Sequence, residues 1–481
     1  MPGDVTRYGP LQDARPYDVV VVGAGVVGAA IARELARHRQ LRIALVEAAG
    51  DVGDGTSKAN TAILHTGFDA TPGTLEARLV REGHRLLSAY AAECGIPVEP
   101  VGALLVAWDE EQLAALPGLA AKADRNGYDA ARLIDADELY AREPHLGPGA
   151  LGALAVPDES IVCPFTTPLA YATQAVRAGV DLHLNARVLS VSWDPGATGH
   201  TLHTGRGPLH ARWLVNAAGL HADAVDRMLG RDTFTVTPRR GQLVVFDKPA
   251  RDLVQHILLP VPTALGKGVL VAPTVFGNVL LGPTAEDLDD KTATHSTEEG
   301  LAALRAQGEK ILPELLEEEV TTVYAGLRAA TDEEDYRIDS WAERRSVTVG
   351  GIRSTGLTAS LAIAAHVTGL LAEAGLDLGA PTSLPPVHMP NLGERFPRPY
   401  QNPERIAADP DYGRIVCHCE RVTLGEIRDA LASTVPPAGL EGLRRRTRAR
   451  AGRCQGFHCG AGLRELLDGE LSRQGGELRS W

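Results

Sequence analysis

Four cysteines in the last part of the sequence have the spacing of a metal-binding site. Cys417 and Cys419 are separated by one residue, and Cys454 and Cys459, which follow after thirty-four residues, are separated by four. Clustered thiolates bind zinc or iron–sulfur clusters, and structural zinc sites usually use cysteine pairs two to four residues apart. The tighter first pair therefore favours a [2Fe-2S] cluster held by all four cysteines. Zinc is the alternative.

A basic run between the two cysteine pairs is consistent with a cluster. A [2Fe-2S] cluster held by four thiolates has a net charge of about −2, which nearby arginines would stabilise. A solvated face, or a docking surface for an acidic partner, is the other explanation. His418 and His458 adjoin the cysteines, but four thiolates complete the iron ligands, so neither histidine is expected to bind iron. The basic residues are Arg444, Arg445, Arg446, Arg448, Arg450 and Arg453.

A glycine-rich turn early in the sequence is typical of a dinucleotide-binding site. Gly23, Gly25 and Gly28 follow a β-branched run and open a helical pattern that also contains Val27. The first glycine permits a tight turn, the second lets a pyrophosphate approach the backbone, and the third allows helix and strand to pack closely. Glu47 ends the next strand-like run, where it can accept hydrogen bonds from ribose hydroxyls.

Two later segments favour FAD over NAD. Residues 213–223 end a strand in small residues, and residues 349–367 enter a helix whose N-terminus can face an anionic isoalloxazine. Three segments around one dinucleotide favour a large cofactor that stays bound, so FAD is predicted. The contacts expected in these two segments are Ala218, Gly219, Gly351, Ser354, Thr355, Gly356, Leu357 and Thr358.

The order of strand-like and helical patterns is that of an α/β protein. The runs 17–22 and 42–47 flank the helical pattern 26–38, which makes a βαβ unit of the Rossmann type. Further strand-like runs predict an additional mixed sheet for a substrate domain. After the cysteine pair 417/419, Thr423 and Glu426 predict a capped helix in a small, mostly helical domain. The runs of the mixed sheet are 182–193, 241–247, 268–273 and 278–283.

A proline-rich segment, residues 379–412, divides the sequence into two parts. Such a density of proline interrupts helices and central strands, so we expect an extended linker between a body, residues 1–378, and a domain at 413–481. A domain of that size often needs a metal to fold. Within the body, FAD-binding parts are expected at about 15–90, 150–230 and 335–378, and a substrate subdomain at about 91–149 and 231–334.

The composition limits the class of protein. With 61 acidic and 48 basic side chains the net charge is −13, so neither nucleic acid nor an anionic membrane is an expected partner. The N-terminal residues lack the pattern of a signal peptide, and the apolar run 357–376 contains polar residues and is predicted to be a buried helix. We therefore expect a cytoplasmic protein without a membrane span. Cys94 and Cys163 lack a partner motif and are expected to be buried thiols.

Taken together, these motifs resemble the FAD-dependent glycerol-3-phosphate dehydrogenases of the D-amino-acid-oxidase-like superfamily. The resemblance is strongest to the anaerobic type, which carries a domain like bacterioferritin-associated ferredoxin, and it covers nearly the whole chain except the linker. It implies a D-amino-acid-oxidase-like fold for the body. The segments that carry it are "GTSKANTAILHTGFD", "GKGVLVAPT", "GLRAATDE", "GGIRSTGLTAS" and the cysteine-containing tail.

The resemblance also implies roles for individual residues. His65 is the expected base for the substrate hydroxyl, and Lys267 and Arg328 are expected to bind an anionic substrate group, since ammonium and guanidinium groups suit a phosphate or a carboxylate. Where related sequences commonly read "SKANSG", this sequence reads "SKANTA", so an alanine replaces a glycine near the flavin. Further flavin contacts are expected from Thr56, Ser57, Asn60 and Val188.

The implied reaction is oxidation of sn-glycerol 3-phosphate to dihydroxyacetone phosphate, with hydride transfer to FAD and electron exit through the [2Fe-2S] cluster. Additional electron-transfer subunits are expected, through which the protein would also contact a membrane. An L-2-hydroxy acid dehydrogenase, acting for example on L-2-hydroxyglutarate, or an amine dehydrogenase is the first alternative. A redox-sensing subunit without turnover is the second.

Overall fold

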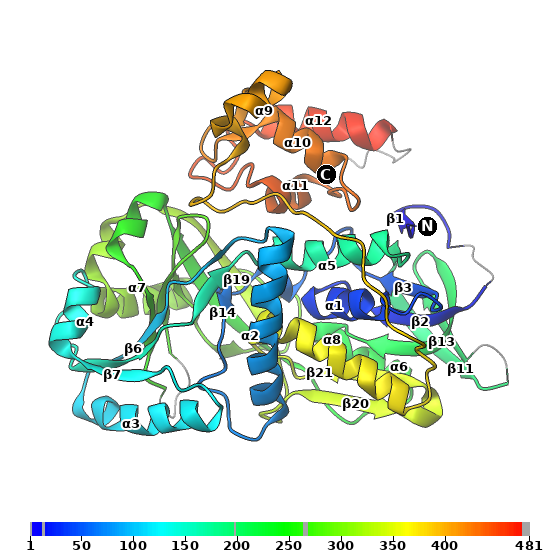
Figure 1. The fold of residues 1–481 in the computed structure, drawn as a ribbon, viewed down its shortest axis with the longest axis horizontal. Helices are drawn as coiled ribbons and strands as arrows, with labels where there is room; N and C mark the ends of the chain where they lie inside the picture. Colours follow the sequence, from blue (N-terminus) through cyan, green and yellow to red (C-terminus); the bar gives the residue numbers. More distant parts are fainter. Residues whose placement is uncertain (1, 12–14, 197–198, 263–267, 474–481) are drawn as a thin grey trace.

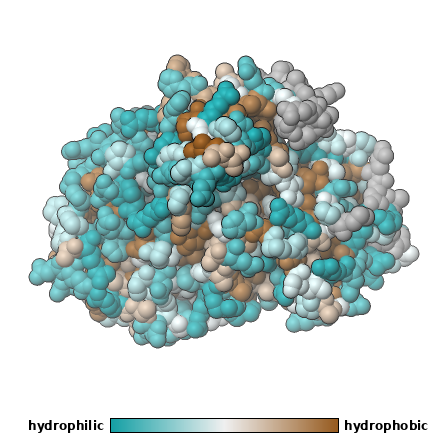
Figure 2. All heavy atoms as spheres, turned by 45° about the horizontal axis from the view of Figure 1, so that its top comes forward, coloured by the Kyte–Doolittle hydropathy of each residue, from teal (hydrophilic) through white to brown (hydrophobic). Residues whose placement is uncertain are grey.

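The computed structural model describes residues 2–11, 15–196, 199–262 and 268–473, and the side chains up to residue 469. Two large sheets make up the body, and a small helical domain lies above them (Figure 1). Seen with that end turned toward the reader, the small domain rests on the body (Figure 2). The α/β architecture expected from the sequence is confirmed.

The first sheet has nine strands and a parallel centre. Its strand β2 ends in four valines, and strand β3 is buried along its full length, as expected for a parallel sheet that is covered on both faces. The strands are β1 (Val5–Thr6), β2 (Tyr17–Val22), β3 (Ile43–Val46), β10 (Asp181–His183), β11 (Val188–Asp194), β12 (Gly199–Thr204), β13 (Gly207–Asn216), β20 (Arg337–Trp341) and β21 (Ser346–Gly350).

Helix α8 lies at the centre of the helical layer and packs against α1 and α2. In the part of the chain that the structure describes, it is the one helix long and apolar enough to cross a membrane, and 67% of it is buried in the protein. It is therefore a core helix, as the run 357–376 predicted. The helices of this domain are α1 (Val26–Leu35), α2 (Leu75–Cys94), α5 (Thr166–Arg177), α6 (Ala222–Met228) and α8 (Gly356–Glu373).

The second sheet also has nine strands and is mixed, since β6 and β15 pair in parallel and the other pairs are antiparallel. A short three-stranded sheet of β4 (Ile63–Leu64), β5 (Val98–Glu99) and β9 (Ser160–Val162) lies apart from it. The strands of the second sheet are β6 (Ala103–Ala107), β7 (Arg132–Asp135), β8 (Gly152–Val156), β14 (Thr237–Phe246), β15 (Ile257–Pro260), β16 (Leu270–Pro273), β17 (Val279–Gly282), β18 (Glu286–Asp287) and β19 (Val320–Ala330). The helices beside it are α3 (Glu110–Arg125), α4 (Ala136–Arg142) and α7 (Glu298–Ile311).

The proline-rich segment crosses the body in an extended conformation before it reaches the small domain (Figure 1). Its backbone bonds to three separate places on the body: Thr382 donates to the Arg37 carbonyl at 2.7 Å, Met389 to Cys94 at 2.8 Å, and Glu394 to Val275 at 2.8 Å. The segment is therefore attached along its length, and it ends in the short helix α9 (Pro403–Ala408).

The small domain is held together by a few apolar side chains, and its helix α10 begins with a side-chain cap. Thr423 caps α10 by accepting from the Glu426 amide at 3.2 Å, and the Glu426 carboxylate accepts from the Thr423 amide at 2.9 Å, which confirms the predicted capping box. Cys417 and Cys459 lie in its core. The elements are β22 (Ile415–Cys417), β23 (Val422–Thr423), α10 (Leu424–Leu431), α11 (Leu440–Thr447) and α12 (Gly460–Arg473).

Candidate functional site

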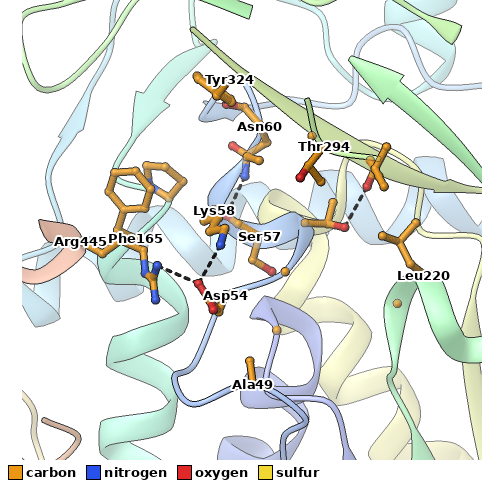
Figure 3. Close-up of a pocket in the computed structure, with 18 of the residues that line it drawn as sticks. Ala49, Asp54, Ser57, Lys58, Asn60, Phe165, Leu220, Thr294, Tyr324 and Arg445 are labelled. Atoms are coloured by element: carbon orange, nitrogen blue, oxygen red, sulfur yellow. Dashed lines mark hydrogen bonds and ion pairs between the residues drawn. The ribbon is translucent and has the colours of Figure 1, made fainter. Parts of the chain in front are cut away.

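A cavity of about 820 Å³ opens between the two sheets and beneath the small domain (Figure 3). Three parts of the fold therefore meet at one site, including residues of the small domain. The sequence-predicted flavin contacts that line the cavity are Gly23, Gly25, Glu47, Thr56, Ser57, Asn60, Val188, Ala218 and Gly219.

The glycines of the glycine-rich turn have different roles, since some permit close packing and one leaves its backbone open to a cofactor. At Gly23, where φ is +101°, a Cβ would lie 2.5 Å from the Ala217 carbonyl oxygen, and at Gly28 it would lie 1.9 Å from the Gly23 oxygen. A Cβ on Gly25 would meet only the Ser57 hydroxyl, at 3.3 Å. Gly28 thus serves close packing of the helix, which is why it does not line the cavity, whereas Gly25 presents open backbone to a phosphate.

Glu47 closes the nucleotide end of the cavity. It follows β3, and its carboxylate accepts from the Ala24 amide and from the Ala49 amide, each at 2.7 Å. Burial raises the pKa of Glu47, which these two hydrogen bonds oppose. A carboxylate has further lone pairs for ribose hydroxyls. The cavity, the glycine turn and this acceptor together fit the adenosine diphosphate part of FAD.

A second set of contacts fixes the turn η1 (Thr56–Lys58) and the residues after it against β19 of the other sheet. The Thr56 hydroxyl donates to the Leu327 carbonyl at 2.8 Å, and the Tyr324 hydroxyl donates to the Asn60 carbonyl at 2.7 Å. A Cβ on Gly326 would lie 2.1 Å from the Ala59 oxygen. Figure 3 shows Tyr324 and Asn60 on the same side of the cavity. The two sheets thus meet at the cavity wall.

Ala62 has an unfavourable backbone conformation in this wall. Its φ is +58°, in the left-handed region that favours glycine, and it occupies the position where the sequence comparison expected glycine. We expect Ala62→Gly to raise the free energy of unfolding by about 1 kcal/mol. Denaturant unfolding followed by flavin fluorescence measures this. Ala49→Gly is the control, since Ala49 lines the same cavity without a positive φ and its replacement should destabilise; equal shifts in both variants would contradict the prediction.

His65 lies beyond the cavity lining, three residues after Ala62, and it is held from two sides. Its backbone amide donates to the Thr358 hydroxyl at 3.0 Å. Its ring Nδ1 lies 2.9 Å from a carboxylate oxygen of Glu159, which is fully buried. The other Glu159 oxygen accepts from the amide and hydroxyl of Thr66 at 2.7 and 3.0 Å. A carboxylate oxygen facing Nδ1 favours the tautomer in which Nδ1 carries the ring proton and Nε2 is the unprotonated nitrogen.

Sequence reasoning missed Glu159. It lies 94 positions from His65 in the sequence, and an isolated glutamate near a strand has no pattern that marks it. Only its complete burial and its contact with His65 reveal it. A buried carboxylate of this kind is usual where an imidazole must be kept in one tautomer.

Arg328 extends from β19 over the second sheet. Its guanidinium donates to the Thr284 carbonyl at 2.8 Å and lies against Gly241, where a Cβ would be 2.5 Å from its Nη2. Burial lowers the pKa of Arg328. No ion pair of Arg328 with a carboxylate is found among the described residues, so its charge is available to an anion. Lys267 lies outside the described residues.

The predicted contacts at the start of α8 lie behind the cavity rather than on its lining. Thr355 donates to Glu76 at 2.6 Å, and Thr358 contacts His65 as described. Gly351 has a φ of +67°, which the turn before α8 requires. Arg328 does not line the cavity either, and together with Val27 and Gly28 the predicted flavin contacts that do not line it are Gly351, Ser354, Thr355, Gly356, Leu357 and Thr358.

The four cysteines of the small domain lie close enough to influence one another. The thiol of Cys419 interacts with those of Cys454 and Cys417, and the thiol of Cys459 with those of Cys417 and Cys454. The 417/419 turn and the 454/459 turn thus bring their cysteines together. Among residues that the structure describes, no three His, Cys, Asp or Glu side chains are arranged around a single metal ion. Four neighbouring thiols suit a binuclear cluster, in which each iron takes two thiolates.

The two remaining cysteines do not belong to this group. Cys94 and Cys163 are buried, with 1% and 0% of their surfaces exposed, and both belong to the main hydrophobic core. Burial raises the pKa of both thiols. They are therefore inert core residues, as predicted.

Comparison with known proteins agrees with both sites. Residues 18–370 match the family "FAD dependent oxidoreductase" (DAO), and residues 415–469 match the family "BFD-like [2Fe-2S] binding domain". A glycerol 3-phosphate dehydrogenase of Caloramator mitchellensis is 34% identical over 458 residues, covering 95% of this chain and 94% of the relative. A mitochondrial L-2-hydroxyglutarate dehydrogenase of Caenorhabditis elegans is 29% identical, over 74% of this chain and 93% of the relative.

A solved structure supports the flavin site. The dithionite-reduced L-alpha-glycerophosphate oxidase of Mycoplasma pneumoniae with FAD bound has a TM-score of 0.72 and 29% identity, and covers 77% of this chain and 97% of its own. FAD and a [2Fe-2S] cluster, the two predicted cofactors, are thereby confirmed. The chain belongs to the DAO family of FAD-dependent oxidoreductases and carries a BFD-like [2Fe-2S]-binding domain after the flavoprotein body.

Proposed function

We propose that the protein is a dehydrogenase that oxidises the secondary alcohol of sn-glycerol 3-phosphate to dihydroxyacetone phosphate. The contact between His65 and the buried Glu159 carries the proposal, because a carboxylate facing Nδ1 favours the tautomer in which Nε2 is the basic nitrogen of the ring. His65 accepts the hydroxyl proton at Nε2. Arg328 binds the phosphate, with Lys267 as its expected partner. FAD, when bound, supplies the acceptor of the hydride that leaves the same carbon.

The comparisons favour glycerol 3-phosphate over other substrates. The relative that aligns over 95% of this chain is a glycerol 3-phosphate dehydrogenase. Because so little of the chain is left unaligned, the alignment extends into the cluster domain at residues 415–469. The relatives that act on L-2-hydroxyglutarate, such as the one from Caenorhabditis elegans, align over 74% of this chain or less. We therefore infer that the cluster domain belongs to a dehydrogenase that delivers electrons to further protein subunits.

Flavin reduction under anaerobic conditions tests the substrate. We expect sn-glycerol 3-phosphate to bleach the flavin absorbance of the purified protein within the mixing time of a manual experiment, and L-2-hydroxyglutarate at the same concentration to leave it unchanged. Glycerol is the control, since it has the alcohol but not the phosphate that Arg328 would bind. Bleaching by the hydroxy acid alone would favour an L-2-hydroxy acid dehydrogenase. Bleaching by none of a panel of alcohols, hydroxy acids and amines would favour a redox sensor.

A further inference from the structure

The small domain forms part of the wall of the flavin cavity. Arg444, Arg445, Arg448 and Ala451, all from α11 and the turn after it, line the cavity together with the glycine turn of the body. Between 387 and 394 positions separate these residues from Ser57 of the body, yet Figure 3 shows Arg445 and Ser57 around the same space. A domain tethered only by its linker would not share a cavity with the body.

A buried ionic contact holds this wall in place. Arg446 binds Asp51 of the body through two parallel hydrogen bonds of 2.6 and 2.7 Å. Arg445 bonds to Asp51 at 3.1 Å and to Asp54 at 2.8 Å. Asp51, Arg445 and Arg446 are each at most 7% exposed. Arg445 and Arg446 of the basic run therefore form a docking contact, and their acidic partner is the body of the same chain.

The charge of Asp51 follows from these contacts. Burial alone raises the pKa of its carboxyl group, but the charge and hydrogen bonds of Arg446, followed by the charges of Arg445 and Arg7, outweigh burial and lower the pKa below its ordinary value. Asp51 is thus ionised at neutral pH. A buried charge without hydration is destabilising unless it is paired, so this contact is stable only while both partners stay in place.

A second contact extends the docked surface over the cavity. The Arg448 guanidinium lies 4.1 Å from the centre of the Phe276 ring and 3.2 Å from the Asn278 side-chain oxygen, and both residues line the cavity. Its Nε also lies 3.3 Å from the Glu420 carboxylate, in the small domain. Arg448 has a φ of +72°, a left-handed conformation that costs energy for a side chain of this kind. The contacts with Phe276 and Asn278 compensate for it.

The residue that follows this part of the cavity wall contacts the cysteine site. Ala451 lines the cavity, and the next residue, Gly452, is packed so closely on Cys419 that a Cβ there would lie 2.5 Å from the cysteine Cβ. Adjacent Cα atoms are about 3.8 Å apart. The backbone that closes the flavin cavity therefore also positions a cluster ligand.

From these contacts we infer that residues 444–451 of the cluster domain are part of the FAD-binding site of this protein. The docked domain closes the cavity over the flavin, and the contact of Asp51 with Arg445 and Arg446 keeps it closed. FAD retention and domain docking are one coupled property. This coupling involves the flavin and not the substrate, so it holds whichever substrate the body oxidises.

Asp51→Asn in the full-length, cofactor-loaded protein tests the coupling. The neutral amide leaves Arg445 and Arg446 without their shared counter-charge, which should open the docked state. We expect two changes relative to wild type: at least tenfold faster tryptic cleavage within residues 379–412, and at least tenfold faster FAD release, seen as flavin fluorescence after dilution. Asp232→Asn is the matched control, because Asp232 pairs with Arg227 within the body and is mostly exposed. It should change neither rate.

Three results would overturn the inference. Faster cleavage with FAD release within twofold of wild type would mean that the docked domain does not close the flavin site. Unchanged cleavage would mean that Asp51 does not hold the domain. If the Asp51→Asn protein has lost its iron and hence its folded domain, FAD release is measured on Arg448→Met, in which the contacts of Asp51 are intact. Release from that variant should be at least threefold faster, and a wild-type rate would reject the proposal.

Discussion

Replacement of His65 by glutamine is expected to slow reduction of the flavin by substrate by about 10²–10⁴-fold, the usual contribution of a general base. Glutamine keeps the size and polarity of the side chain, but it cannot accept the hydroxyl proton at neutral pH. The FAD content should be unchanged, since His65 does not line the cavity. Stopped-flow measurement of flavin absorbance under anaerobic conditions gives the rate directly.

Glu159→Gln separates the base from its positioning residue. An amide can donate to Nδ1, which would place the imidazole proton on Nε2 and remove the base without altering His65 itself. The rate should fall, and its dependence on pH should change from that of wild type, which loss of packing alone would not cause. Glu314→Gln is the matched control, since Glu314 lies 3.0 Å from Nδ1 of His145 in an exposed pair of the same kind. A similar loss of rate in the control would contradict the assignment of His65.

Replacement of Cys454 by serine is expected to abolish the iron–sulfur cluster. Wild-type protein should contain about two irons and two sulfides per chain, and the variant almost none, because one iron loses a thiolate ligand. Iron and sulfide analysis with visible absorption spectra measures this. The small domain has few apolar core residues, so it should also become sensitive to protease once the metal is lost.

The Cys454→Ser variant also separates two steps: reduction of the flavin by substrate, and transfer of electrons from the protein to an acceptor. With FAD in excess, flavin reduction by substrate should stay within a few fold of wild type, whereas electron delivery to a one-electron acceptor should fall steeply. His458→Ala is the control, since His458 adjoins Cys459 and is not needed where four thiolates complete the ligands. Iron loss in this control would contradict the ligand set. One zinc per chain and no iron in the wild-type protein would contradict the cluster itself.

The sequence by itself determined the features that depend on neighbouring residues. Gly23, Gly25 and Gly28 predicted the tight turn, and the structure gives each one a different steric reason. Thr423 and Glu426 predicted the start of α10 because a capping box needs only four consecutive residues. The spacing of the cysteines likewise predicted their use before any fold was known.

Only the tertiary structure decided which distant residues act together. It paired His65 with Glu159 and brought the arginines at 445 and 446 onto Asp51, which lies 394 and 395 positions away in the sequence. The arginines were visible in the sequence, but their partner was not, since an isolated aspartate has no local pattern. Local preferences act over a few residues, whereas these contacts arise from how two sheets and a small domain pack around one cavity.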